Sequence, residues 1–386
     1  MTTIDDLLPG LIAFRRDIHA HPELGFEEKR TAAAIARELR AIGLEVHEGI
    51  GGTGLVGVLK NGTSPRAIGL RADMDALSIH EQTGLPYASC THGVFHGCGH
   101  DGHVAMLLGA AQHLARTKAF DGTVNFIFQP AEEGLGGARE MVAEGLFERF
   151  PCDRVFALHN WPDLPAGTVA TRPGPIMGAA DKFEIVLTGK GGHAAIPHNT
   201  PDAILAASTL VTQLNSIVAR CIPAMSSAVL SVTQIHAGHA HNVLPAEVTI
   251  VGTVRTFDPA VQDTIEARLR EMTHGVAASF GLTSAIDYDR YYPATINDAD
   301  AAAEALQIAA GVATAQLASE PAFTSEDFAF MLHACKGAYL WLGQGCGPGS
   351  PPLHNPGYDF NDDILATGLR LHVALVEALL GADEKA

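Results

Sequence analysis

The sequence is poor in basic residues, aromatic residues and long apolar runs, and each shortage excludes a class of protein. Its 386 residues hold 25 lysines and arginines against 43 aspartates and glutamates, a formal net charge of −18. A polyphosphate partner would be repelled almost everywhere, so we expect no nucleic-acid partner. No run approaches the roughly 20 apolar residues of a membrane span, so we expect no membrane partner. Aromatic residues make up only 6%, which disfavours an aromatic binding surface.

Cysteine is also scarce. The six cysteines lie far apart in a long chain, unlike those of a small secreted disulfide scaffold; they are Cys90, Cys98, Cys152, Cys221, Cys335 and Cys346. The first ten residues, MTTIDDLLPG, carry acidic residues where a signal peptide needs basic ones, and no apolar core follows. We therefore expect a reducing, cytoplasmic environment.

Predicted strands and helices alternate along the chain, which is typical of an α/β protein with a largely parallel sheet. Two helices are expected within 5–43 and a third over 101–116, with strands near 44–49, 54–60, 67–73, 123–129 and 154–160. Residues 180–293 follow the order β-α-β-β-α-β, a ferredoxin-like unit. The simplest architecture is a discontinuous catalytic domain (1–179 and 294–386), with a mixed, largely parallel sheet flanked by helices. Residues 180–293 would be an inserted lid or dimerisation domain.

The segment GIGGTG at 49–54 formally matches the dinucleotide-binding pattern G-x-G-x-x-G. That pattern binds a pyrophosphate only where a helix opens at the turn. Here the strand-like run LVGVLKNG follows instead, so we interpret GIGGTG as a plain turn between two strands.

The segment HGCGHDGH at 96–103 brings Cys98 and His100 to the start of the helix predicted over 101–116. Helix N-termini favour a thiolate, and cysteine with histidine suits zinc or a similar metal. Asp101 is placed to cap the helix. By itself the segment leaves two alternatives open, a redox or thiol-enzyme loop and a glycine-rich turn with solvated histidines. His96 and His103 are expected to pack or to support the site.

Three further segments favour a metal site. Glu132 and Glu133 follow a strand in QPAEEG, His159 ends a strand in RVFALHNWP, and His354 lies in the loop PPLHNPG. Each can also be interpreted without a metal: the glutamates as carboxylates at the start of a helix, and His159 as a structural histidine. However, RAD, HGCGHDGH, QPAEEG and FALHNW fall at the carboxyl ends of predicted strands or at the connections that lead into a helix, the edge where open α/β sheets build their sites. One shared site is the better interpretation.

Taken in order, the motifs resemble the M20 metallopeptidase superfamily, specifically its amidohydrolase branch of hippurate, N-acyl-amino-acid and auxin-conjugate hydrolases. The resemblance covers nearly the whole chain and is carried by HPELGFEE, RADMDAL, HGCGHDGH, QPAEEG, GKGGHAAIPH, HNVLPAEV, GTVRTF, SEDF and LHNPGYDFND. It implies two divalent metal ions (zinc, manganese, cobalt or nickel) bound by Cys98, His100, Glu133, His159 and His354. Glu132 would be the general acid/base.

The resemblance also implies supporting roles and one departure. Asp73 and Asp101 would orient ligands, although the usual His-x-Asp pair is replaced by Arg71-Ala72-Asp73, so that Asp73 has no histidine to orient there. His193 would stabilise the oxyanion, in many relatives across a dimer interface, and Asn242 and Arg255 would contact the substrate. Arg255 could equally belong to a solvated strand face. A homodimer through the inserted domain, or a higher oligomer, is expected.

The expected activity is hydrolysis of N-acyl amino acids to a carboxylate and a free amino acid. The rivals are a di- or aminopeptidase of the same superfamily, a catalytically silent ligand-binding homologue, and a thiol enzyme with Cys98 as its nucleophile.

Overall fold

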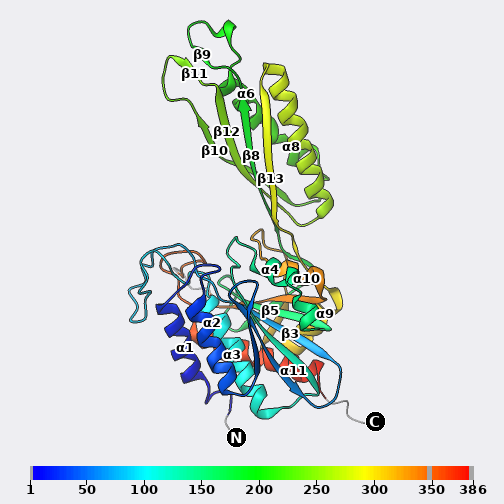
Figure 1. Cartoon of the computed structure of the whole chain (residues 1–386). Helices are drawn as coiled ribbons and strands as arrows, with labels where there is room; N and C mark the ends of the chain where they lie inside the picture. The colour runs from blue at the N-terminus through cyan, green and yellow to red at the C-terminus, as the bar shows by residue number, and fades with distance from the viewer. Residues whose placement is uncertain (1–2, 346–349, 382–386) are drawn as a thin grey trace. The chain divides into compact units, whose positions relative to one another are not determined.

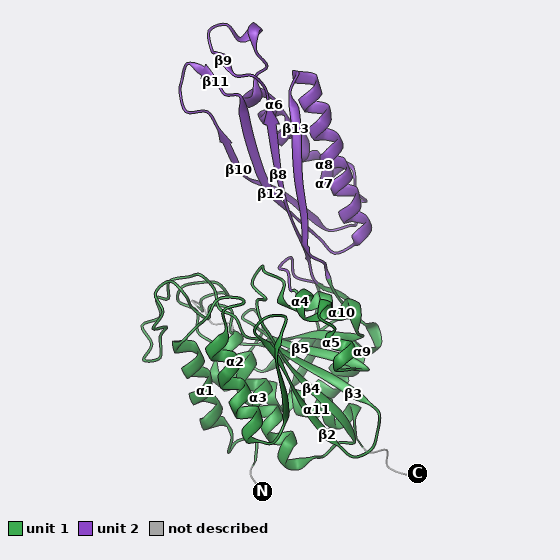
Figure 2. Cartoon of the chain, in the orientation of Figure 1, with its two compact units in different colours: residues 1–176, 295–320, 327–386 green, residues 177–294, 321–326 purple. Residues whose placement is uncertain are grey.

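The computed structural model describes residues 3–345 and 350–381 of the chain. Its backbone forms two compact units, shown in Figure 2: unit 1 (1–176, 295–320 and 327–386) and unit 2 (177–294 and 321–326). Residues 321–326 group with unit 2 because the Gly178 N–H donates to the carbonyl oxygens of Ala322 (3.0 Å) and Thr324 (2.9 Å). Within the described part of the chain, no helix is long and apolar enough to cross a membrane.

Unit 1 is built on one mixed eight-stranded sheet with the strand order β1-β2-β4-β3-β5-β16-β6-β15. Strand β3 runs parallel to both β4 and β5, and β5 runs parallel to β16, so the centre of the sheet is parallel; β1, β2 and β6 join it by antiparallel pairs. The strands are β1 (Glu45–Ile50), β2 (Gly54–Asn61), β3 (Ala67–Asp73), β4 (Gly122–Gln129), β5 (Arg154–Trp161), β6 (Thr168–Thr171), β15 (Thr314–Leu317) and β16 (Gly337–Gly343). Two short strands, β7 (Gly174–Met177) and β14 (Thr295–Asn297), form a separate ribbon.

The helices of unit 1 cover both faces of this sheet. Alternate residues of β3, β4, β5 and β16 join the main apolar core with α1, α2, α3, α9 and α11, while α4 and α10 contact β4 and β5 (Figure 1). The α-helices are α1 (Leu8–Ala20), α2 (Lys29–Ala41), α3 (His100–Thr117), α4 (Gly137–Ala143), α5 (Leu146–Arg149), α9 (Ala299–Ala309), α10 (Phe328–Ala334) and α11 (Leu365–Leu379), and a short 3-10 helix, η2 (Asp362–Ile364), precedes α11. Since the core takes every second strand residue, the intervening side chains, among them Arg71, Gln129 and His159, lie on the other face.

Unit 2 is a four-stranded antiparallel sheet with the order β10-β12-β8-β13. Helices α6 and α8 supply most of the rest of its apolar core, with Ile217 of α7 and Leu282. Both helices start at an aspartate whose side chain accepts a backbone N–H, Asp202 from Leu205 and Asp258 from Ala260. The elements are β8 (Ala179–Thr188), β9 (Gly192–His193), η1 (Pro197–Asn199), α6 (Ala203–Leu214), α7 (Ser216–Arg220), β10 (Ala228–Ala237), β11 (Val243–Leu244), β12 (Glu247–Thr256), α8 (Pro259–Phe280) and β13 (Thr283–Tyr292).

The predicted fold class is confirmed: a mixed α/β sheet flanked by helices, with a βαββαβ unit (β8 to β13) inserted in the sequence between strands β6 and β15 of that sheet. GIGGTG is the turn between the antiparallel strands β1 and β2, as predicted. The first helix of the βαββαβ unit is followed directly by the short helix α7, and α4 and α5 are separated by Gly145, whose φ is +84°. The short strands β6, β7, β14 and β15 were not predicted, because three or four residues are too few to show an alternating pattern.

Candidate metal centre

The predicted ligands of unit 1 gather at one edge of its sheet. Since β3, β4 and β5 are parallel, their carboxyl ends meet, and the segments that follow them lie together with the start of α3. Cys98, His100 and His159 are all buried there, and the side chain of His354 reaches the same place from the loop before η2 while staying half exposed. The His354 N–H donates to the Gly97 carbonyl oxygen (2.8 Å), which ties that loop to the turn carrying Cys98.

The structure brings the five predicted ligands and Glu132 together. Ligand atoms of Cys98, Glu133 and His354 lie within 4.8 Å of one another, as do those of His100, Glu132 and Glu133. Cys98 Sγ lies 3.4 Å from His159 Nε2, and His354 Nε2 lies 3.3 Å from Glu133 Oε1. This mixture of one sulfur, imidazole nitrogens and carboxylate oxygens is a donor set for zinc or a neighbouring transition metal.

Two hydrogen bonds fix which nitrogen of each buried histidine faces the centre. His159 Nδ1 lies 2.8 Å from the Asn160 carbonyl oxygen and therefore carries the proton, which leaves a lone pair on Nε2, the nitrogen 3.4 Å from Cys98 Sγ. His100 Nδ1 lies 3.2 Å from Asp75 Oδ1. His100 Nε2 is buried and makes no hydrogen bond with the described residues. A buried ring nitrogen without a hydrogen bond costs free energy unless something binds it, and a metal ion fits that place, beside the carboxylates of Asp73 and Glu133.

The carboxylates around the centre disfavour ionisation of an isolated thiol and favour a positive charge. Burial raises the pKa of the Cys98 thiol well above its ordinary value, and the carboxylates of Glu133 and Glu132 raise it further. The expectation that the helix N-terminus makes Cys98 a thiolate is therefore wrong for the side chain alone. Burial lowers the pKa of His100, but Asp73, Asp75 and Glu133 outweigh it and raise that pKa to about 10. Burial and the neighbouring His103 hold the pKa of His159 well below the usual range, so it is neutral.

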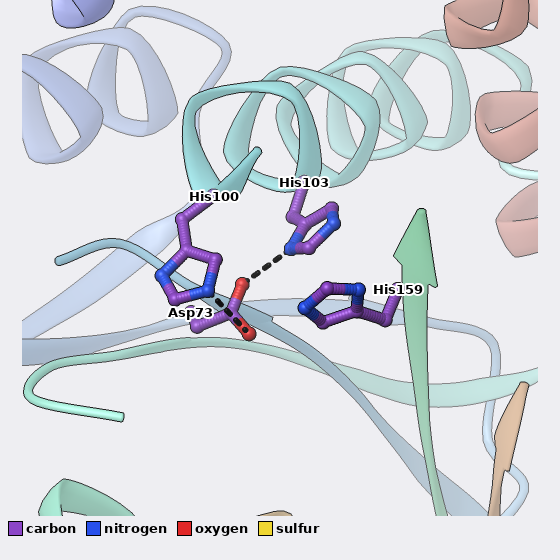
Figure 3. Close-up of side chains that lie close together, drawn as sticks. All are labelled: Asp73, His100, His103 and His159. Atoms are coloured by element: carbon purple, nitrogen blue, oxygen red, sulfur yellow. Dashed lines mark hydrogen bonds and ion pairs between the residues drawn. The ribbon is translucent and has the colours of Figure 1, made fainter. Parts of the chain in front are cut away.

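Asp73 does hold a histidine, contrary to expectation. Figure 3 shows His100 and His103, both on α3, facing Asp73 at the end of β3. Asp73 Oδ1 lies 2.5 Å from His103 Nδ1, and its Oδ2 lies 2.7 Å from Arg71 and 3.7 Å from His100 Nε2. His103 Nε2 is engaged in turn by Asn160 (2.6 Å to Oδ1), so both of its nitrogens are occupied and it supports the centre rather than facing it. The spacing within 71–73 missed this pair because the histidine comes from another element.

Asp75 is the residue that sequence reasoning missed. Its Oδ1 lies against His100 Nδ1, and its Oδ2 accepts the Glu133 N–H (3.0 Å). Asp75 therefore orients two predicted ligands at once, the role usual for a carboxylate behind a metal-bound histidine. The signal was present in RADMDAL, where a second aspartate follows Asp73 by two residues.

Asp101 does not cap α3 and does not support a ligand. The N-cap position is Gly99, and Asp101 lies inside the first turn. Its Oδ2 accepts from Arg15 (3.0 Å) and lies 2.8 Å from His19 Nδ1, both on α1. Burial opposes ionisation of Asp101, but Arg15 and His19 hold its pKa well below the usual range. Asp101 thus anchors α1 to the ligand-bearing helix.

Gly99 is required between Cys98 and His100. Its φ of +90° is in the left-handed region, and a Cβ there would lie 2.5 Å from Asn160 Oδ1 and 2.8 Å from the Tyr358 hydroxyl. Only glycine lets the chain turn this sharply beside the end of β5.

The other predicted site residues belong to unit 2. His193 and Asn242 lie side by side, since β9 pairs with β11 and the Ala194 N–H donates to the Asn242 carbonyl oxygen (3.0 Å). His193 Nδ1 accepts the Ala195 N–H (3.1 Å), so its Nε2 carries a proton that it can donate, and the side chain is exposed. Arg255 is at the opposite end of β12, paired with Ala180. Glu247 lies eight residue steps from Arg255 along the strand, roughly 25 Å, and Asn242 lies beyond Glu247.

Comparisons with known proteins agree with this geometry. Residues 69–378 match the model of peptidase family M20/M25/M40. The chain is 41% identical over 373 residues to a hippurate hydrolase of Campylobacter jejuni, with 96% of each chain covered. It is 37% identical over 372 residues to an N-acetylcysteine deacetylase of Bacillus subtilis, covering 96% of this chain and 97% of that one. The crystal structure of a dinuclear metal-binding M20 peptidase from Bacillus subtilis superposes with a TM-score of 0.86 at 34% identity, covering 97% of this chain and 99% of that one.

Proposed function

The chain belongs to peptidase family M20/M25/M40, in its amidohydrolase branch, and we propose from this that it cleaves the acyl group from N-acyl amino acids. It is a metal-dependent hydrolase of linear amides. One observation carries the proposal: sulfur, nitrogen and oxygen donors from four separate segments converge on one place, and Glu132 lies beside them within 4.8 Å of His100 and Glu133.

Each side chain has a task in amide hydrolysis. Cys98, His100, Glu133, His159 and His354 would hold two divalent ions, which supply what the side chains lack, a lowered pKa for water and a polarised carbonyl. Glu132 is only 6% exposed. From there it can take the proton of the attacking water and deliver it to the leaving nitrogen. Asp75 keeps the Nε2 atom of His100 turned inward, and Asp73 holds His103 against Asn160.

We assign the remaining roles to unit 2 and to a second copy of the chain. The free Nε2–H of His193 is a suitable donor for an oxyanion, and Asn242 beside it and Arg255 are suitable donors for a substrate carboxylate. A small substrate cannot touch both ends of β12 in one copy. We therefore propose a homodimer through unit 2, in which His193 and Asn242 act on a substrate held by the partner copy. The five described cysteines are free thiols, which is consistent with the proposed cytoplasmic location; Cys346 lies outside the described residues.

A substrate screen with controlled metal content tests the proposed reaction. Freshly purified protein is analysed for metal, stripped with a chelator, reloaded with zinc, manganese, cobalt or nickel, and assayed on N-acetyl and N-benzoyl amino acids beside free dipeptides. We expect turnover of the acylated substrates only, lost on chelation and restored by metal. Turnover of dipeptides alone would identify a peptidase instead, and activity that survives chelation but not thiol alkylation would identify a thiol enzyme.

Two variants separate catalysis from binding. Glu132→Gln should abolish turnover and leave the metal content unchanged; a fully active Glu132→Gln protein would remove Glu132 from the mechanism. Mixing Glu132→Gln with His193→Ala subunits should recover part of the activity if His193 serves the partner copy, since a mixed dimer then contains one intact site. No recovery after subunit exchange would place His193 and Glu132 in the same copy.

A further inference from the structure

A buried carboxylate that the proposed mechanism does not use lies behind the turn carrying Glu132. Glu28, from the HPELGFEE segment, has no exposed surface. One of its oxygens accepts the Ala131 N–H at 2.8 Å, and the other accepts the Thr53 hydroxyl. Although Glu28 occupies the N-cap position of α2, its side chain does not cap that helix. Its hydrogen bonds go to the turn 103 residues along the chain and to the β1–β2 turn.

The partner of Glu28 is a backbone position that needs support. Ala131 has a φ of +53°, a left-handed conformation that is unfavourable for a residue with a Cβ. It directly precedes Glu132 and Glu133, so its φ decides the direction in which both carboxylates leave the end of β4. The Ala131 carbonyl oxygen accepts the Gly137 N–H (3.0 Å), which closes the turn on its other side.

Two sequence motifs without another assigned role converge on this turn. Gly25 of HPELGFEE approaches it so closely that a Cβ there would lie 3.0 Å from Ala131 Cα. Gly54 of GIGGTG is equally close to Pro130, with a Cβ position 2.9 Å from its Cδ. Thr53 of the same motif binds Glu28. Both motifs therefore serve to bring a carboxylate and its supporting hydroxyl against the strained residue.

Placing a carboxylate here works against stability. Burial raises the pKa of Glu28 to about 7, and the nearby Asp75 contributes in the same direction, while the bonds from Thr53 and Ala131 oppose the rise. An apolar side chain would fill the space without that penalty. Such a departure from the most stable choice is typical of a residue that serves function.

We propose that Glu28 is a positioning residue for Glu132: by holding the Ala131 N–H, it keeps the turn in the conformation that directs Glu132 toward the reacting atoms. The proposal rests on the proposed role of Glu132 as acid/base. Glu133 depends less on this contact, because Asp75 holds its N–H separately. Loss of Glu28 should therefore affect catalysis more than metal binding.

The test compares three variants at saturating metal. Glu28→Ala should lower kcat by about 10- to 100-fold with a KM within about threefold of the wild type, since a displacement of about 1 Å can cost that much. Glu28→Gln, which keeps an acceptor oxygen for Ala131, should recover most of the kcat. Glu28→Ala combined with Ala131→Gly should recover part of it, because glycine adopts a positive φ without strain.

Glu23→Ala is the matched control. Glu23 lies in the same segment and accepts two backbone N–H groups, from Arg30 (3.0 Å) and Thr31 (2.9 Å), but does not bind the Glu132 turn. We expect it to lower stability and leave kcat within about twofold. Equal losses of kcat in Glu28→Ala and Glu23→Ala, or a kcat for Glu28→Ala within twofold of the wild type, would overturn the proposal.

A readout independent of turnover keeps the two proposals distinguishable. Hydrogen exchange at the Ala131 amide, followed by mass spectrometry of the peptide that contains it, should accelerate at least tenfold in Glu28→Ala and stay unchanged in Glu23→Ala. Accelerated exchange in a protein that hydrolyses no amide would refute the proposed function but support the proposal that Glu28 holds the Ala131 turn. Unchanged exchange in Glu28→Ala would refute the proposal that Glu28 holds this turn, whatever the activity of the variant.

Discussion

Asp75 and Asp101 provide a sharp test of how the metal centre is supported. Both are buried aspartates near His100, but sequence reasoning predicted a supporting role for Asp101 and missed Asp75. In the structure Asp75 contacts His100 and Glu133, while Asp101 contacts Arg15 and His19. Changing each to asparagine keeps the shape of the side chain and removes its charge. The two variants should therefore fail in different ways.

The expected magnitudes follow from these contacts. In Asp75→Asn, one amide oxygen remains for two N–H donors, so one of the two ligands loses its support. Changes of this kind typically weaken metal binding by about 10- to 100-fold, or roughly 1.4–2.7 kcal/mol. Asp101→Asn removes the anion shared by the buried Arg15 and His19 side chains, although Arg15 keeps Asp359 and Asp362 and His19 keeps Glu81. Because leaving a buried charge with no partner costs about 3–5 kcal/mol of folding stability, we expect a cost near the lower end, about 3 kcal/mol.

Two measurements separate these effects. Metal affinity is obtained by competition with a chromophoric chelator, and the free energy of unfolding by urea titration of the metal-free protein. We expect Asp75→Asn to weaken metal binding by at least tenfold and to cost less than about 2 kcal/mol of stability. Asp101→Asn should show the reverse, with metal affinity within about threefold of the wild type. The reasoning is refuted if Asp101→Asn weakens metal binding as much as Asp75→Asn, or if Asp75→Asn binds metal like the wild type.

Three further changes have defined outcomes. Burial lowers the pKa of His19, but Asp101 and Glu81 outweigh it and raise that pKa to about 9. The charged imidazolium therefore stabilises the folded state fully below pH 6.5, the pKa of histidine in the unfolded chain, and this stabilisation is lost as pH rises through 9. The stability advantage of the wild type over His19→Gln should thus shrink by roughly 3 kcal/mol between pH 6 and 9.5, and a constant difference would contradict it. Glu28 has a linkage of the same sign in a lower pH window, since its raised carboxyl pKa also makes the folded state lose stability as pH rises, here between 4.5 and about 7. Urea titrations should show Glu28→Gln gaining up to roughly 3 kcal/mol on the wild type over that interval, and no gain would contradict the raised pKa. Gly99→Ala should lower the folding stability by about 2 kcal/mol or more and weaken metal binding. Gly84→Ala, with a φ of +68° and no atom within 4 Å of the new Cβ, should show only the smaller cost of backbone strain. Equal losses of stability in thermal unfolding would exclude a steric clash at Gly99.

The order of motifs along the chain was enough to predict the α/β class, the inserted βαββαβ unit and the gathering of Cys98, His100, Glu133, His159 and His354. Such patterns are local: a parallel strand followed by a short loop places the loop at a known edge of the sheet, whatever the rest of the fold does. The same logic explains why GIGGTG could be recognised as a turn, since the decision depended only on whether a helix or a strand came next.

The supporting contacts could not be predicted, because they join elements that are distant in the sequence. His103 reaches Asp73 from α3, so no spacing within RADMDAL could show the pair. Asp101 occupies a position typical of a helix cap, yet its partners come from α1, and burial among those charges decided its role. The pKa of Cys98 was misjudged for a similar reason, since burial and two carboxylates outweigh the helix terminus.

The sequence by itself determined which side chains can bind metal and which edge of the sheet they occupy, because both depend on residue type and on the order of strands. Only the tertiary structure decided which atoms of those side chains face the centre and what holds them there. Orientation depends on hydrogen bonds that the carboxylates of Asp75, Asp73 and Glu28 accept, and on strained positions such as Ala131 that exist only once separate elements have packed together.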